Sequence, residues 1–154
     1  MRVLPIAATD DEIRALVVEW SELLAQRRYS DALALLPHST VEIDWTPDRL
    51  EEAISTYGAI GEDKETTDYF LARHRVSSFE ITTLLGRPDS AEIIGNIDVD
   101  REHLFGLDSK QYLGMVHYDQ VPLSGFRSDL TAQFNIKRVG TDQLTLEFLN
   151  LHVM

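Results

Sequence analysis

From Phe126 to Val139, apolar and polar side chains alternate almost without a break. Between Phe126 and Val139 nearly every second residue is apolar, which is the period of a β-strand with one buried face. A turn at Gly140–Asp142 leads into a second apolar-rich run, Leu144 to Met154. Two such runs joined by a short turn predict a pair of long antiparallel strands.

The second run changes phase near its middle. Its apolar residues keep one parity up to Phe148 and take the other parity from Leu149 onward. Side chains on a strand alternate with a period of two, so a slip of one residue predicts a β-bulge here. The alternative is a strand end that is buried on both faces.

The N-terminal part of the chain has the pattern of amphipathic helices. A capping box at Thr9–Glu12 opens a helix that extends from Asp10 to Arg28. A short helix is expected from Ser30 to Leu36, and a third begins at Thr46–Pro47 and ends at Gly58. The apolar side chains of the first helix share one face: Ile13, Leu16, Val17, Trp20, Leu23 and Leu24.

The middle of the chain gives weaker patterns. Short alternating segments predict strands at Thr40–Trp45, Ser77–Leu85 and Ala91–Val99. The polar stretch from Gly61 to His74 is expected to be a loop with at most one helical turn. Tyr112–Asp119 is apolar on both faces and is therefore expected to be a central strand.

This order of elements predicts an α+β fold in which three N-terminal helices pack on a curved antiparallel sheet. No internal repeat or linker divides the sequence, so residues 1–154 are expected to form a single domain. The order resembles the NTF2-like (SnoaL-like, cystatin-like cone) superfamily over Thr9 to Met154. The resemblance rests on the long first helix, the Thr46–Pro47 helix start, and the segments Ser128–Phe134 and Leu149–Met154.

The resemblance implies a cone-shaped sheet whose helices close over a cavity, and commonly a homodimer. It implies no particular reaction, because that fold hosts isomerases, dehydratases, transport factors, immunity proteins and binding modules.

The net charge of −12 bears on possible partners. Nucleic acids and anionic membranes both attract a basic surface, so neither is expected as a partner. The absence of cysteine excludes disulfides and thiolate metal sites, and the five histidines are not closely spaced, so no metal is expected. No cofactor-binding motif is present, and neither a secretory leader nor a membrane span is recognisable, so we expect a cytoplasmic protein without a cofactor.

Three residues are candidate catalytic groups. Asp44 precedes Trp45 where the mouth of a cone would lie, and a carboxylate in apolar surroundings can act as a general base. The alternative is a loop aspartate beside a core tryptophan. His117 and Asp119 share a face of the predicted central strand and would suit a base with its orienting carboxylate, although a structural histidine in a sheet is the alternative.

Aromatic and imidazole side chains are the candidate ligand-binding groups. Such groups orient small molecules in largely apolar pockets. We therefore expect a module that binds a small apolar or amphipathic ligand in the cone. One alternative is a cofactor-independent isomerase or dehydratase with Asp44 or His117 as base, and another is an acidic partner-binding protein of the immunity type. The predicted lining residues are Trp20, Trp45, Tyr57, Tyr69, His74 and Tyr118.

The outward positions of the Phe126–Val139 segment carry mixed charges, unlike the acidic remainder of the chain. A strip with both signs can be self-complementary, so we expect a homodimer through the outer face of the C-terminal strands. The alternative is a solvated sheet face. The strip consists of Arg127, Asp129, Thr131, Gln133, Asn135 and Lys137.

Overall fold

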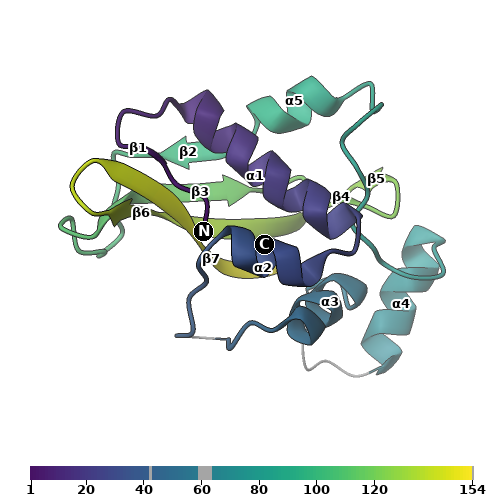
Figure 1. The fold of residues 1–154 in the computed structure, drawn as a ribbon. Coiled ribbons are helices and arrows are strands. Elements are labelled where there is room, and N and C mark those ends of the chain that lie inside the picture. Colours follow the sequence, from purple (N-terminus) through teal and green to yellow (C-terminus); the bar gives the residue numbers. More distant parts are fainter. Residues whose placement is uncertain (42, 59–63, 154) are drawn as a thin grey trace.

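The structure, a computed structural model, describes residues 1–41, 43–58 and 64–153. Its helices and strands are arranged as Figure 1 shows. The helices are α1 (Asp10–Ala25), α2 (Tyr29–Leu35), α3 (Pro47–Ser55), α4 (Lys64–His74) and α5 (Ser90–Gly95). The strands are β1 (Leu4–Pro5), β2 (Asp98–Asp100), β3 (Tyr112–Tyr118), β4 (Pro122–Leu123), β5 (Phe126–Arg127), β6 (Leu130–Val139) and β7 (Gln143–Val153).

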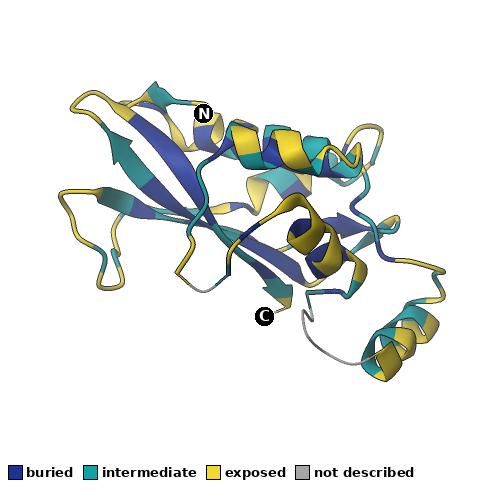
Figure 2. Cartoon of the chain, turned by 60° about the horizontal axis from the view of Figure 1, so that its bottom comes forward, coloured by how far each residue is buried: buried dark blue, intermediate teal, exposed yellow. Residues whose placement is uncertain are grey.

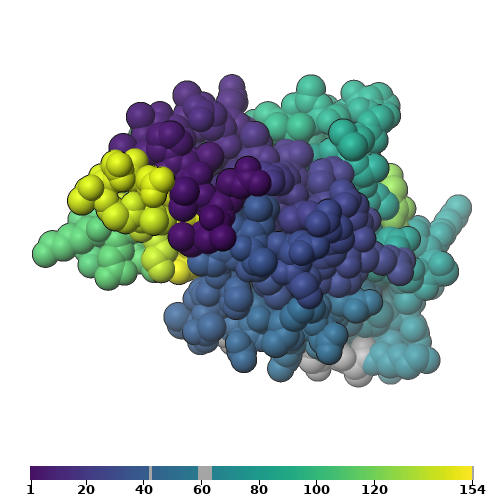
Figure 3. All heavy atoms as spheres, in the orientation of Figure 1, coloured from purple at the N-terminus to yellow at the C-terminus, as the bar shows by residue number. Residues whose placement is uncertain are grey.

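A curled antiparallel sheet forms the centre of this α+β fold. Its strand order is β1-β7-β6-β3-β2, and β4 and β5 form a separate hairpin. Helix α1 lies across one face of the sheet, which we call the inner face (Figure 1). Seen from the helix side, the N-terminal segments cover much of the sheet, while the β6–β7 turn and the loop before β3 reach beyond them (Figure 3).

The two long C-terminal strands confirm the predicted bulge. β6 and β7 pair from Leu130 and Val153 at one end to Val139 and Gln143 at the other. The register shifts by one residue between Gln133, which pairs with Asn150, and Phe134, which pairs with Phe148. Leu149 is therefore the extra residue, at the position where the apolar phase changes.

Trp20 joins helix α1 to the inner face of the sheet. Its side chain is 1% exposed and packs edge-to-face on Phe134, with ring centroids 5.1 Å apart. It also contacts Phe148 at 4.9 Å. Such aromatic pairs add stability beyond the burial of their area. The helical stripe predicted from the sequence thus meets the apolar face predicted for the last two strands.

The C-terminal half of β7 is an edge, and the segment after α2 covers it. The backbone amide of Phe148 donates to the Pro37 carbonyl at 2.8 Å, and the amide of Ser39 donates to the Phe148 carbonyl at 2.9 Å. The indole Nε1 of Trp45 donates to the Leu149 carbonyl at 2.9 Å. The predicted strand Thr40–Trp45 is wrong in its described residues, because single contacts rather than a strand ladder satisfy this edge.

Several predictions for the middle of the chain are also wrong. The segment Ser77–Leu85 makes only one isolated bridge, from Ile81 to Leu123, and is not a strand. The predicted strand Ala91–Val99 is helix α5 followed by the start of β2. Ile93 and Ile97 are both buried. Their spacing of four residues suits a helical turn as well as a strand face, which is the ambiguity of short apolar runs.

Two further boundaries differ from the prediction. The described part of Gly61–His74 is helix α4 rather than a loop, while residues 61–63 lie outside the described residues. α4 has no buried residue (Figure 2). Its sequence therefore lacks the apolar stripe from which a helix is predicted. The predicted strand Phe126–Val139 is interrupted at Ser128–Asp129, where the Ser128 hydroxyl donates to the Val121 carbonyl and accepts from the Leu130 amide.

Candidate functional site

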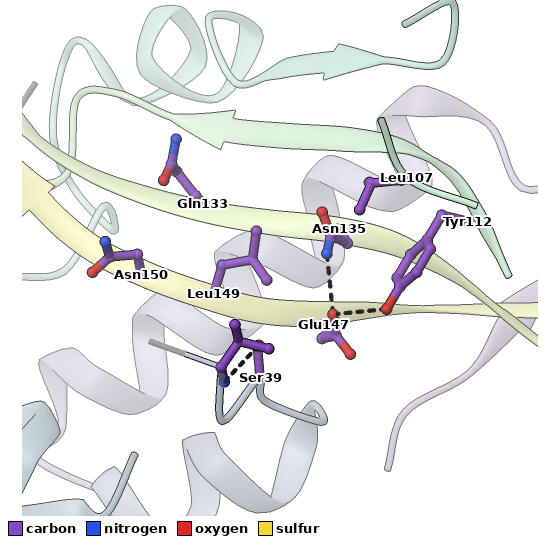
Figure 4. A pocket seen from close by; sticks show the side chains of 9 residues that line it. Ser39, Leu107, Tyr112, Gln133, Asn135, Glu147, Leu149 and Asn150 are labelled. Atoms are coloured by element: carbon purple, nitrogen blue, oxygen red, sulfur yellow. Dashed lines mark hydrogen bonds between the residues drawn. The ribbon is translucent and has the colours of Figure 1, made fainter. Parts of the chain in front are cut away.

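A pocket of about 260 Å³ opens on the outer face of the sheet, opposite helix α1 (Figure 4). Strands β3, β6 and β7 supply its floor, and the loop before β3 and the segment after α2 supply its walls. Its lining residues are Ser39, Val41, Leu107, Tyr112, Gln133, Asn135, Glu147, Leu149 and Asn150.

The carboxylate of Glu147 is the centre of the pocket floor. Glu147 is only 8% exposed, although it is a charged residue. Its Oε1 accepts from the Asn135 amide nitrogen at 3.0 Å and from the Tyr112 hydroxyl at 3.4 Å. Its Oε2 accepts from Lys137 Nζ at 3.3 Å. Buried carboxylates need such partners because desolvation of an isolated charge is costly.

Strand register explains why these groups meet. Asn135 and Glu147 are cross-strand partners on β6 and β7, so their side chains leave the same face side by side. Tyr112 joins them because its partner is Lys137 on β6. The register then shifts before Gly114. Gly114 has φ +154°, and a Cβ there would lie 2.1 Å from the Asp100 carbonyl oxygen, so glycine is required at this close approach.

Tyr112 is held as a proton donor. Burial, and then the charge of Glu147, raise the pKa of the Tyr112 hydroxyl above its ordinary value. A tyrosine hydroxyl is protonated at neutral pH even at its ordinary pKa, so this one can donate to Glu147.

Asn135 contributes an acceptor that no described residue supplies with a donor. The residue is 4% exposed, and its amide Oδ1 is buried without a hydrogen-bond partner among the residues that the structure describes. The amide orientation follows from Glu147: a flipped amide would place Oδ1 against the carboxylate oxygen instead of a donor. Figure 4 shows the amide nitrogen directed toward Glu147 and the oxygen directed away. The floor therefore combines a nearly buried carboxylate with a buried amide oxygen that has no donor among the described residues.

The walls of the pocket are partly apolar. Leu107, Val41 and Leu149 line it, and the bulge residue Leu149 lies between Glu147 and Asn150 along β7. The arrangement suits a molecule with a hydrogen-bonding end and a short apolar body. Among the described residues no group of three or more histidine or acidic side chains is arranged to hold a metal ion.

Four of the predicted ligand-binding residues lie in the core, namely Trp20, Trp45, Tyr57 and Tyr118. Trp20, Trp45 and Tyr118 are each at most 2% exposed. Trp20 packs on the inner face as described above, and Trp45 contacts Phe148 with ring centroids 4.8 Å apart. None of the four core residues lines the outer-face pocket.

The structure brings Tyr57 and His74 together, at a distance from this pocket. Their rings stack with centroids 5.3 Å apart, and His74 also stacks on Phe126 at 4.5 Å. This cluster attaches the end of helix α4 to the β4–β5 hairpin. Tyr69 is 60% exposed and touches only Phe70 among the ring contacts of the described residues.

The three predicted catalytic residues are not assembled into one site. Asp44 is exposed in the loop before α3. His117 is half-buried on the outer face, where its cross-strand partners are Asp98 and Gln133. Asp119 follows the end of β3 and is exposed, and within the described residues no hydrogen bond or ion pair joins it to His117.

Sequence reasoning missed Glu147 and Tyr112. The available signal was a carboxylate between Leu146 and Phe148, in the middle of an apolar strand. A charge at such a position is rare unless it is paired. Its partners lie on neighbouring strands, so they follow only from the register.

Within the described residues no helix is both long and apolar enough to span a bilayer. Comparison of the chain with protein-family models, with curated proteins and with solved structures found no match.

Proposed function

We propose that this protein is a binding module that holds a small amphipathic molecule in the outer-face pocket. The observation that carries the proposal is the buried Glu147 carboxylate on the floor of a pocket with apolar walls. A polar end of the ligand meets this floor, and its apolar part contacts Leu107 and Leu149.

The energetics of the floor support a binding role. A buried carboxylate with an incomplete set of partners contributes little net stability, and apolar residues of similar shape are often as good or better. Asn135 adds an acceptor without a donor, which itself costs free energy. A ligand that supplies the missing donor would account for both residues.

We also propose that the fold is an NTF2-like cone. The curled sheet, with helix α1 across its inner face, supports this proposal. Large aromatic side chains occupy the space between α1 and the sheet, including Trp20, Phe134 and Tyr118. We therefore assign the ligand to the outer face rather than to the inside of the cone.

A blocking substitution tests the binding proposal. Gln133 lines the pocket and is half-buried, so Gln133→Trp should fill it. Gln143→Trp is the matched control, because Gln143 is exposed at the start of β7 and does not line the pocket. Ligand-detected NMR with a library of small amphipathic molecules should give hits that Gln133→Trp removes and Gln143→Trp keeps. A library without hits, or hits that survive Gln133→Trp, would reject the proposal.

The homodimer through this face remains a proposal. Gln133 and Lys137 are partly exposed there, whereas Thr131 and Asn135 are buried, and Arg127 lies on the β4–β5 hairpin. Light scattering of a dimer should report twice the chain mass of 17.5 kDa, and Gln133→Glu should lower it. A monomer at micromolar concentration would exclude the dimer without touching the ligand proposal.

A further inference from the structure

The chemistry of the pocket floor defines the ligand further, and this step rests on the proposed function. We infer that the occupant is a small alkylammonium ion, whose charged nitrogen donates to Glu147 and Asn135 and whose carbon chain lies against the apolar walls.

The pocket floor has more hydrogen-bond acceptor capacity than its own donors satisfy. The Asn135 amide oxygen is buried and has no donor among the described residues, while the amide nitrogen donates to Glu147. The Tyr112 hydroxyl donates to the same carboxylate. Each carboxylate oxygen can accept about two hydrogen bonds, so Oε2, with one bond from Lys137, has capacity left. A ligand with acceptors alone would leave the Asn135 oxygen unpaired.

Lys137 shows that this carboxylate takes an ammonium group. Its Nζ lies 3.3 Å from Glu147 Oε2, and its side chain is 37% exposed while that of Glu147 is 11% exposed. The pair thus joins a partly exposed cation to a nearly buried anion. An incoming ammonium would compete with Lys137 for the same oxygen, and the released lysine would move into solvent.

The net charge of the whole chain also favours a cationic ligand. With a net charge of −12, the protein raises the local concentration of small cations and lowers that of anions. The pocket volume of about 260 Å³ and the leucines on its walls limit the carbon chain to a short one.

Three matched probes test the charge of the head group. n-Hexylammonium, hexanol and hexanoate share one chain and differ only at the polar end. Each probe is titrated into the protein at neutral pH, and binding is measured from the chemical-shift changes of the pocket amides. Hexylammonium should bind most tightly of the three. Glu147→Gln should abolish that preference while the thermal unfolding curve stays cooperative.

The direction of the affinity change in the Lys137→Met variant is the most specific test of the inference. Removing the internal competitor should tighten hexylammonium binding about 2- to 5-fold, the range expected from a partly exposed ion pair. The same substitution should weaken the binding of any anionic probe. Two results would overturn the inference and leave the binding module intact. One is that the unmodified protein binds hexanoate more tightly than hexylammonium, and the other is that Lys137→Met loses hexylammonium binding. If none of the three probes binds and the amphipathic library also gives no hits, the proposed function fails too.

A fourth probe separates a free amine from a protein side chain. Nα-acetyl-lysine methylamide carries the same ammonium on a peptide unit. Weaker binding than hexylammonium supports the small free amine, and tighter binding would overturn it as the occupant.

Discussion

The two faces of the central sheet are built from the same strands but are buried by different means. On the inner face apolar side chains of β6 and β7, such as Phe134, Leu146 and Phe148, pack under helix α1. On the outer face four polar residues of these strands are also at most 8% exposed. They are Thr131, Asn135, Thr145 and Glu147.

Each of these outer-face residues is buried with a partner. The Thr145 hydroxyl donates to the Arg2 carbonyl at 2.7 Å, and the Thr131 hydroxyl donates to the Asp129 carbonyl at 3.3 Å. Asn135 and Glu147 bond to each other. Apolar packing on the inner face supplies stability, whereas the outer face fixes polar groups in position, and the Asn135 amide oxygen finds no donor within the described part of the chain. The comparison assigns the support of the fold to the inner face and leaves the outer face for the site that we propose.

The largest effect is expected on the inner face. Trp20→Ala should lower the free energy of unfolding by about 3–5 kcal/mol, because it removes a fully buried indole and leaves a cavity between α1 and the sheet. Tyr69→Ala, at an exposed aromatic residue on α4, is the control and should change stability by about 0.5 kcal/mol or less. Urea unfolding measures both. Equal stability of the two variants would contradict the role assigned to the inner face.

The sequence predicted the parts of the fold whose elements are long and periodic. α1 and its cap, the start of α3, the β6–β7 pair and the bulge at Leu149 were all recognisable. Each has a strong local signal, either a helical stripe with a cap or an alternation that changes phase. The segments between Ser77 and Val99 were misread because they are short, and tertiary contacts decided their conformation.

The candidate site was much less accessible to sequence reasoning. Predicted aromatic residues such as Trp20 and Tyr118 are core residues, since large aromatic side chains serve packing and binding equally well. Glu147 was visible as a charge in an apolar strand, but its role depends on Tyr112 and Asn135. Those contacts come from the bulge before Gly114 and from the register of three strands, which the sequence alone does not specify.

A double-mutant cycle on the outer face should give the next effect. Glu147→Leu leaves the Asn135 amide nitrogen and the Tyr112 hydroxyl without their acceptor, and should cost about 1–3 kcal/mol. Adding Asn135→Leu to the Glu147→Leu variant removes the stranded amide and should recover about 1 kcal/mol or more, because both partners are then apolar. Chemical unfolding of the two single variants and the double variant measures the coupling. A further loss of stability in the double variant would show that the polar floor itself stabilises the fold.

Alkaline titration compares one tyrosine from each face and gives the smallest effect. Burial raises the pKa of the Tyr118 hydroxyl on the inner face above its ordinary value of 10.0, and it raises that of Tyr112 on the outer face as well. A raised pKa in the folded state means that the unfolded chain loses its proton first. The associated stability is fully present below pH 10 and is lost as the pH rises toward the folded pKa.

For Tyr118 the loss should approach about 1.4 kcal/mol for each pH unit above 10, since the buried hydroxyl stays protonated while the unfolded chain ionises. Tyr118→Phe should therefore flatten the pH dependence of unfolding measured between about pH 9 and about pH 11. Tyr112→Phe should flatten it less, because this hydroxyl is only partly buried beside the open pocket. If Tyr112→Phe flattened the pH dependence of unfolding more than Tyr118→Phe, the Tyr112 hydroxyl would be the more buried of the two. The assignment of an accessible ligand site to the outer face would then fail.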